Sequence, residues 1–191
     1  KFEYVNGKII ISNMIIVRED VTAVTGKLEV DGSVYVIGSV YSGGYISATG
    51  DIIIEHNVEA AKLIAGGNIM IKKGSCSKNE CFIEAKGEVS GSFFEAATIE
   101  ADGNIMANYI MNSEINTMGK VIVSGSKGML LGGKVRAVRG VDTYNLGNKS
   151  HIKTFLEVGK NTLYDKKQAV YAEKREQILD ELWLSLIHIS E

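Results

Sequence analysis

The sequence lacks proline, has only two cysteines and contains no long apolar run. Glycine, in contrast, occurs 21 times. Long ordered loops usually use both proline and glycine, so this imbalance disfavours a loop-rich enzyme. Cys76 and Cys81 are too few for a disulfide scaffold and are typical of a reducing compartment. Because no stretch of eighteen apolar residues occurs, we expect no membrane span. A formal net charge of −2 gives no reason to expect binding to nucleic acid or to anionic membranes.

What the sequence does have is a glycine-centred repeat with apolar residues at alternate positions. The five clearest copies are Ile46-Ala48-Gly50-Ile52-Ile54, Leu63-Ala65-Gly67-Ile69-Ile71, Ile83-Ala85-Gly87-Val89, Ile99-Ala101-Gly103-Ile105-Ala107 and Ile115-Thr117-Gly119-Val121-Val123. A period of two predicts β-strands with one side buried. The glycine between two strands marks a bend where a side chain would not fit.

The residues between the apolar positions are mostly polar, and we expect them to face water. They are Asp51, Glu55, Asn68, Lys72, Glu84, Glu88, Glu100, Asn104, Glu114, Asn116 and Lys120. A second bend is predicted at a pair of small or turn-prone residues before each strand. These pairs are Gly43-Gly44, Ala60-Ala61, Ala96-Ala97, Asn112-Ser113 and Gly132-Gly133. Each repeat therefore contains about three short strands joined by fixed bends.

The repeat length selects the fold class. Successive glycines stand at positions 32, 50, 67, 87, 103 and 119. The spacing between them is the length expected for one coil of a three-faced parallel β-solenoid. Seven or eight coils stacked at about 4.8 Å would give a rod of about 35 Å. A left-handed hexapeptide helix would need spacings in multiples of six. The sequence therefore predicts an all-β, right-handed parallel β-helix, with Ile52, Ile69, Val89, Ile105 and Val121 stacked inside it.

Three segments also carry a resemblance to a known family. They are "YISATGDIIIEHNVEAAKLIAGGNIMIKKG", "IEADGNIMANYIMNSEINTMGKVIVSGSKGMLLGGKVRA" and the closing "FLEVG". Over about Thr25 to Lys160 the chain resembles the bacterial flagellar assembly protein A (FapA) family, a domain formerly of unknown function. The resemblance implies a cytoplasmic right-handed β-helix between an N-terminal domain and a C-terminal coiled coil. It further implies an association with flagellar assembly or polar placement, and no established catalytic activity.

The ends of the chain differ from the repeat. Residues 1–24 are expected to be strands that join an N-terminal domain not contained in this chain, residues 25–160 the β-helix, and residues 161–183 the start of a helix. In that helix Tyr171 and Ile178 lie seven apart, which fits either a coiled coil or a helix that caps the last coil. Residues 184–191, "LSLIHISE", are the in-frame translation of CTGTCTCTTATACACATCTCCGAG, a transposon-library adapter. We therefore expect them, with His188, to be an artefact.

No catalytic, cofactor-binding or metal-binding residue is predicted. Cys76 and Cys81 form an isolated C-x4-C, and Cys81 occupies a small-residue position, so a packed free thiol is favoured over a metal ligand. Neither His56 nor His151 lies near a serine or cysteine nucleophile motif. Asp51, Glu88 and Asp102 flank glycine bends and are interpreted as surface acids. The segment from Ile122 to Leu131 lacks the spacing of a phosphate-binding loop.

These observations predict a non-catalytic scaffold protein of the bacterial cytoplasm that acts through protein partners and possible self-association. The outward residues Phe93, Tyr109 and Met111 form either a docking strip or ordinary packing between coils. A self-polymerising β-helix of the bactofilin type is the first alternative. A polysaccharide-active β-helix enzyme is the second, but the coils leave little length for the walls of a substrate groove.

Overall fold

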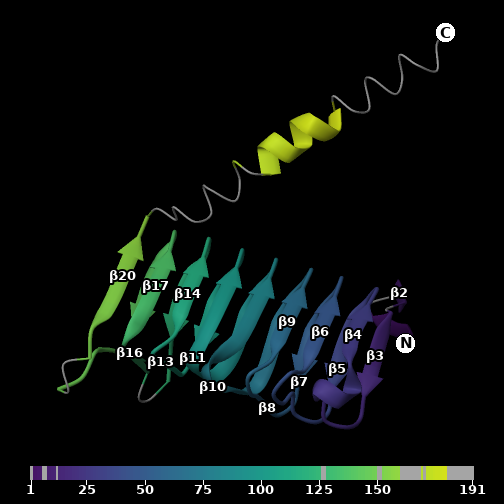
Figure 1. Cartoon of the computed structure of the whole chain (residues 1–191), viewed down its shortest axis with the longest axis horizontal. Helices are drawn as coiled ribbons and strands as arrows, with labels where there is room; N and C mark the ends of the chain where they lie inside the picture. The colour runs from purple at the N-terminus through teal and green to yellow at the C-terminus, as the bar shows by residue number, and fades with distance from the viewer. Residues whose placement is uncertain are drawn as a thin grey trace. The chain divides into compact units, whose positions relative to one another are not determined.

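The computed structural model of the chain (Figure 1) describes residues 2–5, 8–11, 13–125, 128–149, 152–159, 169 and 171–179. The chain divides into two units, residues 1–160 and residues 161–191, and each is treated separately below. A short antiparallel hairpin, β1 (Phe2–Val5) and β2 (Lys8–Ile11), precedes the main body of the first unit.

The first unit is a parallel β-solenoid of eight coils with three faces, which we name A, B and C. Face A consists of β3 (Met14–Val17), β5 (Ser33–Val36), β7 (Ile52–Ile54), the first parts of β10 (Ile69–Ala85) and β11 (Val89–Ala101), β12 (Ile105–Ala107), β15 (Lys120–Val123) and β18 (Gly140–Thr143). Face B consists of bridges through Val21 and Val40, β8 (Asn57–Val58), the middles of β10 and β11, β13 (Tyr109–Met111), β16 (Met129–Leu131) and β19 (Asn145–Leu146).

Face C completes each coil and is followed most easily in Figure 1, where its strands lie side by side from β4 to β20. It consists of β4 (Lys27–Val30), β6 (Tyr45–Ala48), β9 (Lys62–Ala65), the last parts of β10 and β11, β14 (Glu114–Thr117), β17 (Gly133–Ala137) and β20 (Thr154–Val158). Every strand pairing in the solenoid is parallel and joins a strand of one coil to a strand of the next. The predicted parallel solenoid is therefore confirmed. Its first coil begins at Met14, so residues before Thr25 already belong to the stack.

The interior consists of the stacked aliphatic residues predicted from the repeat. On face A the pairing register places Ile52, Ile69, Val89, Ile105 and Val121 in one row, and each is fully buried. The rows of faces B and C include Phe94, the largest fully buried side chain. Each buried aliphatic side chain contributes roughly 1.5–3 kcal/mol. These rows therefore fix the register of the coils.

The glycine bend lies between faces C and A and is set by contact between coils. A Cβ atom built on Gly103 would lie 2.8 Å from the backbone carbon and oxygen of Gly87, and one on Gly119 would lie 2.6 Å from the oxygen of Gly103. The Gly103 amide donates to the Gly87 oxygen at 2.9 Å. Glycine is required here because the backbone of one coil occupies the place of a side chain on the next.

The second predicted bend, between faces B and C, has left-handed backbone at the first residue of each pair. Ala60, Ala96 and Asn112 have φ values of 45°, 50° and 48°. Non-glycine residues seldom adopt this conformation, which costs about 1–2 kcal/mol relative to right-handed backbone. The second residue of the three non-glycine pairs packs inward: Ala61 and Ala97 are each 2% exposed and Ser113 is 1% exposed. Cys81 pairs with Ala97 and takes the same position, as its sequence context predicted.

The second unit contains the predicted helix, seen at residue 169 and at residues 171–179. All of these residues are exposed, and Tyr171, Ile178 and Leu179 are its exposed large apolar side chains. Whether the helix pairs in a coiled coil stays a prediction. Residues 184–191, including His188, lie outside the described residues. Among the residues described, none lies in a helix that is both long and apolar enough to cross a membrane.

Candidate interaction surface

The outer side of face A carries an almost uninterrupted row of apolar side chains. One outward position recurs in every coil because the strands pair in parallel without a shift there. Its occupants in coils one to seven are Ile16, Tyr35, Ile53, Met70, Ser90, Met106 and Ile122. Ile16 is 50% exposed and Met70 is 45% exposed. In coil eight the row ends at Asp142.

A polar row runs along one side of this apolar row and links the coils. The Asp51 carboxylate accepts a hydrogen bond from the backbone amide of Asn68 at 2.6 Å. The Asn68 side chain accepts from the amide of Glu88 at 2.8 Å, and the Asn104 side chain donates to the Glu88 carboxylate at 2.8 Å. The Asn104 oxygen in turn accepts from the amide of Lys120 at 3.0 Å. Asp51, Asn68 and Asn104 therefore cap backbone amides of the following coil, whereas the Glu88 carboxylate binds the Asn104 side chain. The repeat pattern did not predict these contacts for Asp51 and Glu88.

A charged cluster on the other side of the apolar row is formed by Glu55 and Lys72, together with Tyr35 of the row itself. Lys72 donates to the Glu55 carboxylate at 2.5 Å, and the Tyr35 hydroxyl donates to the same oxygen. The hydrogen bond from Lys72, followed by that from Tyr35, lowers the pKa of the Glu55 carboxyl. The same bonds raise the pKa of Lys72 and of Tyr35. The cluster thus joins three successive coils through one carboxylate.

Face B carries the second apolar strip. Phe93, Tyr109 and Met129 occupy one outward row in coils five to seven, and each is half-buried. Met111 lies in the adjacent row and accepts a contact from the Tyr109 hydroxyl at its sulfur. These residues therefore stack on one another from coil to coil. Whether the strip also binds a partner stays a prediction.

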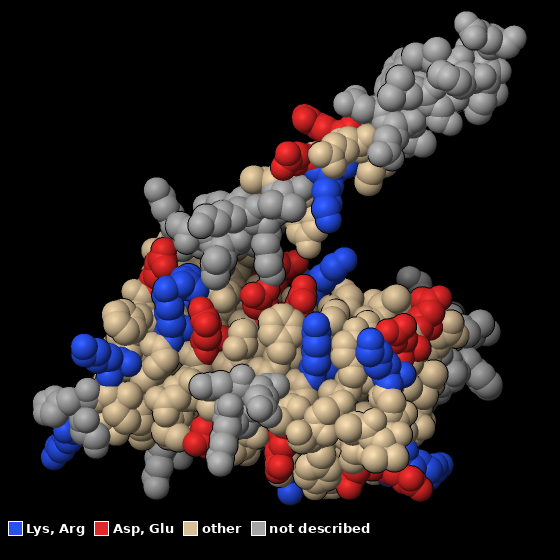
Figure 2. All heavy atoms as spheres, viewed as in Figure 1, with Lys and Arg blue, Asp and Glu red and all other residues tan. Residues whose placement is uncertain are grey.

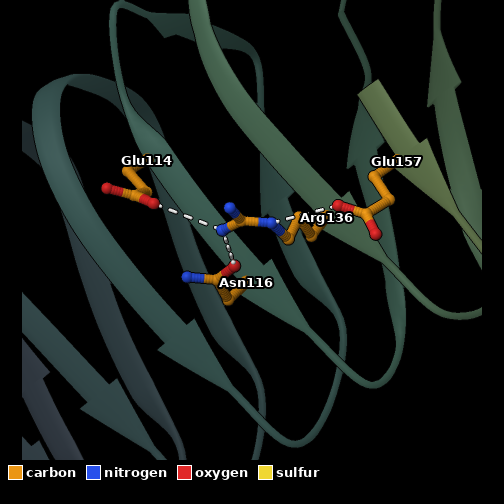
Figure 3. A network of polar contacts seen from close by, with 4 residues as sticks. All are labelled: Glu114, Asn116, Arg136 and Glu157. Carbon is orange, nitrogen blue, oxygen red and sulfur yellow. Dashed lines mark hydrogen bonds and ion pairs between the residues drawn. The ribbon is translucent and has the colours of Figure 1, made fainter. Parts of the chain in front are cut away.

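Face C contains a buried arginine network (Figure 3). Arg136 of β17 donates to Glu114 and Glu157, each at 3.2 Å, and to the Asn116 side chain at 2.9 Å. Only 9% of the Arg136 side chain is exposed, although it points to the outer side of the sheet. The network joins coils six, seven and eight. Arg136 therefore binds residues on both strands that flank β17, namely β14 and β20.

The expectation that Asn116 faces water is wrong, because Asn116 is 7% exposed. Its amide oxygen accepts from Arg136 and is thereby satisfied inside the sheet surface. Alternation alone could not show this, since Asn116 does occupy an outward position. The available signal was the register of "EINT", "KVRA" and "FLEV" in successive repeats. That register places Arg136 between a polar and an acidic residue.

Charged residues on the side of the solenoid seen in Figure 2 are of mixed sign. Lys27 lies over the Tyr45 ring and Lys62 over the Phe82 ring, at 5.5 and 5.4 Å from the ring centres. A shallow hollow of about 450 Å³ lies at the bend between faces B and C. Its lining residues are Ala97, Thr98, Asn112, Ser113, Glu114, Gly133, Lys134, Lys153 and Phe155.

The comparisons with known proteins agree with this architecture. A family profile described as "Flagellar Assembly Protein A beta solenoid domain" (FapA) matches residues 13–186. The chain belongs to this family. No curated protein and no solved structure gave a match. The resemblance seen in the sequence is therefore confirmed at the level of the family.

In this FapA-family chain the two thiols are poorly suited to nucleophilic or ligand chemistry. Burial raises the pKa of Cys81, which is 1% exposed. Partial burial and the hydrogen bond from its Sγ to Glu95 at 3.5 Å raise the pKa of Cys76. Both thiols are consequently protonated at neutral pH. Within the described part of the chain, no three His, Cys, Asp or Glu residues gather as metal ligands.

Among the described residues, the remaining candidates from the sequence do not come together in one place. His56 is exposed in the turn between β7 and β8, and His151 lies outside the described residues. Asp102 is exposed at the glycine bend. The segment from Ile122 to Leu131 turns through Gly125, whose φ is +139°, and the Gly128 amide donates to the Gly125 oxygen. Ser124 and Gly125 line an open hollow with Tyr144 and Asn145 of coil eight.

Proposed function

We propose that this chain is a non-catalytic structural component of the bacterial cytoplasm that serves flagellar assembly or polar placement by binding other proteins. Membership of the flagellar assembly protein A family supports this role. In the proposed role the solenoid is a rigid spacer between an N-terminal domain and a coiled coil. Eight coils at about 4.8 Å would separate the two by about 35 Å.

The observation that most strongly favours a scaffold is that polar side chains in the described coils bind neighbouring coils. Asp51, Asn68, Glu88 and Asn104 bind the backbone or side chains of neighbouring coils, and Arg136 joins three coils. Catalytic sites instead gather titratable groups in a cleft where they reach one substrate. The outer faces here carry straight rows of side chains, which suit contacts with protein surfaces.

The role can be tested by deleting the gene in a bacterium that carries it and examining flagella by electron microscopy. We expect flagella that are absent, reduced or misplaced, together with slower spreading in soft agar. The full-length gene should restore both properties. The variant Ile83→Asp, which places a charge in the interior, should not restore them, whereas Glu84→Lys on the outer side of the same strand should. Unchanged flagellar number, position and swimming in the deletion strain would overturn the proposal.

A self-polymerising cytoskeletal role is the second candidate. It is favoured by the exposure of inward-pointing residues at the last coil, where Leu146 and Val158 are 55% and 56% exposed. Such a protein would form filaments that lengthen with concentration. Negative-stain electron microscopy over a concentration series distinguishes this role from that of a discrete scaffold.

A further inference from the structure

The last coil of the solenoid exposes side chains that every earlier coil buries. Leu156 and Val158 of β20 pair with Val135 and Ala137 of β17, and Leu146 of β19 pairs with Leu130. The three residues of coil seven are fully buried. Their counterparts in coil eight, Leu146, Leu156 and Val158, are 55%, 41% and 56% exposed. The interior of the solenoid is therefore open at this end of the first unit.

The backbone of coil eight also exposes hydrogen-bonding groups of the kind that join each earlier coil to the next. Inward residues of face A donate their amides to the following coil, as Ile52 does to Asn68 and Val89 to Asn104, at 2.9 and 3.0 Å. Val141 is the equivalent residue of coil eight by register. Among the described residues β18, β19 and β20 pair with strands of coil seven, and no strand pairs with their far side. An apolar strand edge of this kind is a template for pairing with another chain.

The opposite end of the solenoid is less open. In coil one the inward residues Val21 and Val30 are buried, with 0% and 8% exposure. Ile15, which pairs with Val34, is the inward residue of that coil with the largest exposure, at 46%. The two ends therefore differ. A copy that stacked head to tail would have to join an open end to a largely covered one.

We propose that a second copy of this chain stacks its own coil eight on coil eight, so that two solenoids join at their C-terminal ends. The contact continues the coil-to-coil packing that holds the chain itself together. A two-fold axis across the rod would set β20 antiparallel to β20 of the second copy, and β18 opposite β19. Such an interface uses the same surface twice and closes at two copies. This inference is independent of the flagellar role proposed above.

The size of the surface limits the strength of this dimer. Five residues of β20 span about 17 Å, so the end of the rod is smaller than the roughly 800 Å² per partner of a standard interface. We therefore expect dissociation in the micromolar range.

Sedimentation of the whole chain from 1 to 200 µM, with four variants, tests the proposal. The wild type should pass from monomer to dimer and stop there. Leu156→Asp should remain monomeric over this range, and so should Leu146→Asp, which introduces the same charge from another strand. Ile15→Asp is the matched control at the other end, and we expect it to dimerise as the wild type does. Far-UV circular dichroism confirms that each variant keeps its β structure.

Any of the following results would overturn the proposal. A monomeric wild type at 200 µM would show that the end does not pair. Dimers that persist in both Leu156→Asp and Leu146→Asp would place the contact elsewhere, and loss of those dimers in Ile178→Asp would assign it to the helix. Larger assemblies that Ile15→Asp also abolishes would indicate head-to-tail stacking. None of these results bears on the flagellar role, which the deletion strain tests separately.

Discussion

Replacement of Ile105 by alanine tests the inward and outward assignment of the repeat. Ile105 is fully buried between Val89 and Val121, the residues directly before and after it in the stacked row. The change removes three carbon atoms, at about 0.8 kcal/mol for each. The cavity left between two fixed coils adds to this loss, and Ile→Ala changes in cores cost about 2–5 kcal/mol. We therefore expect a loss of about 3–4 kcal/mol in the free energy of unfolding.

The matched control is Met106→Ala, in the same strand but on its outer side. Met106 is half-buried in the outer row of face A, so we expect a loss of about 1 kcal/mol or less. Urea unfolding followed by far-UV circular dichroism measures both changes. Hydrogen exchange of the β12 amides should locate the effect, because each coil is stabilised mainly by its neighbours. Equal losses in the two variants, or a larger loss for Met106→Ala, would refute the assignment.

Three further predictions concern the bends and the polar contacts. Gly103→Ala should lower the free energy of unfolding by about 1–3 kcal/mol, because its Cβ would meet rigid backbone; an unchanged urea midpoint would contradict this. Arg136→Met should cost about 2–4 kcal/mol by leaving the buried Asn116 oxygen without its donor, and a neutral or stabilising effect would contradict the assigned role. Lys72→Met should raise the pKa of Glu55, measured by NMR titration of its carboxyl. Since that pKa is lowered in the folded protein, the stabilisation by Glu55 is present above the ordinary carboxyl pKa and is lost as pH falls through the folded value. An unmoved Glu55 titration would show that Lys72 is not the cause.

The sequence was sufficient to predict the fold because its signal is repeated in every coil. Ile52, Ile69 and Val89 occupy equivalent positions in successive coils, so the same alternating pattern occurs several times in the sequence. The small-residue pairs were also informative. Ala60 and Ala96 have left-handed backbone at a packed bend, where little space remains for a larger side chain.

The sequence was insufficient where a residue acts across coils with its side chain. Alternation assigns Asn116 and Arg136 to the outer side, and both do lie there, but it does not show that they bury one another. The outer apolar row was missed for a related reason. Met70 and Met106 look like isolated exposed residues until the register places them two coils apart in one line. Such contacts depend on pairing register, which the pattern of a single coil does not contain.

Disulfide formation between neighbouring coils is the most direct test of that register, on which the interior, the outer rows and the open end all depend. In a chain with Cys76→Ser and Cys81→Ala, cysteines are placed at Met70 and Ser90, which are paired residues of coils four and five. Paired strands lie about 4.8 Å apart, a distance that a disulfide spans, whereas cysteines more than about 7 Å apart are not bridged. We predict rapid intramolecular bridging of the 70/90 pair on mild oxidation, and none for cysteines at Met70 and Met106, two coils apart. Bridging of the 70/106 pair, or failure of the 70/90 pair in the folded protein, would contradict the account.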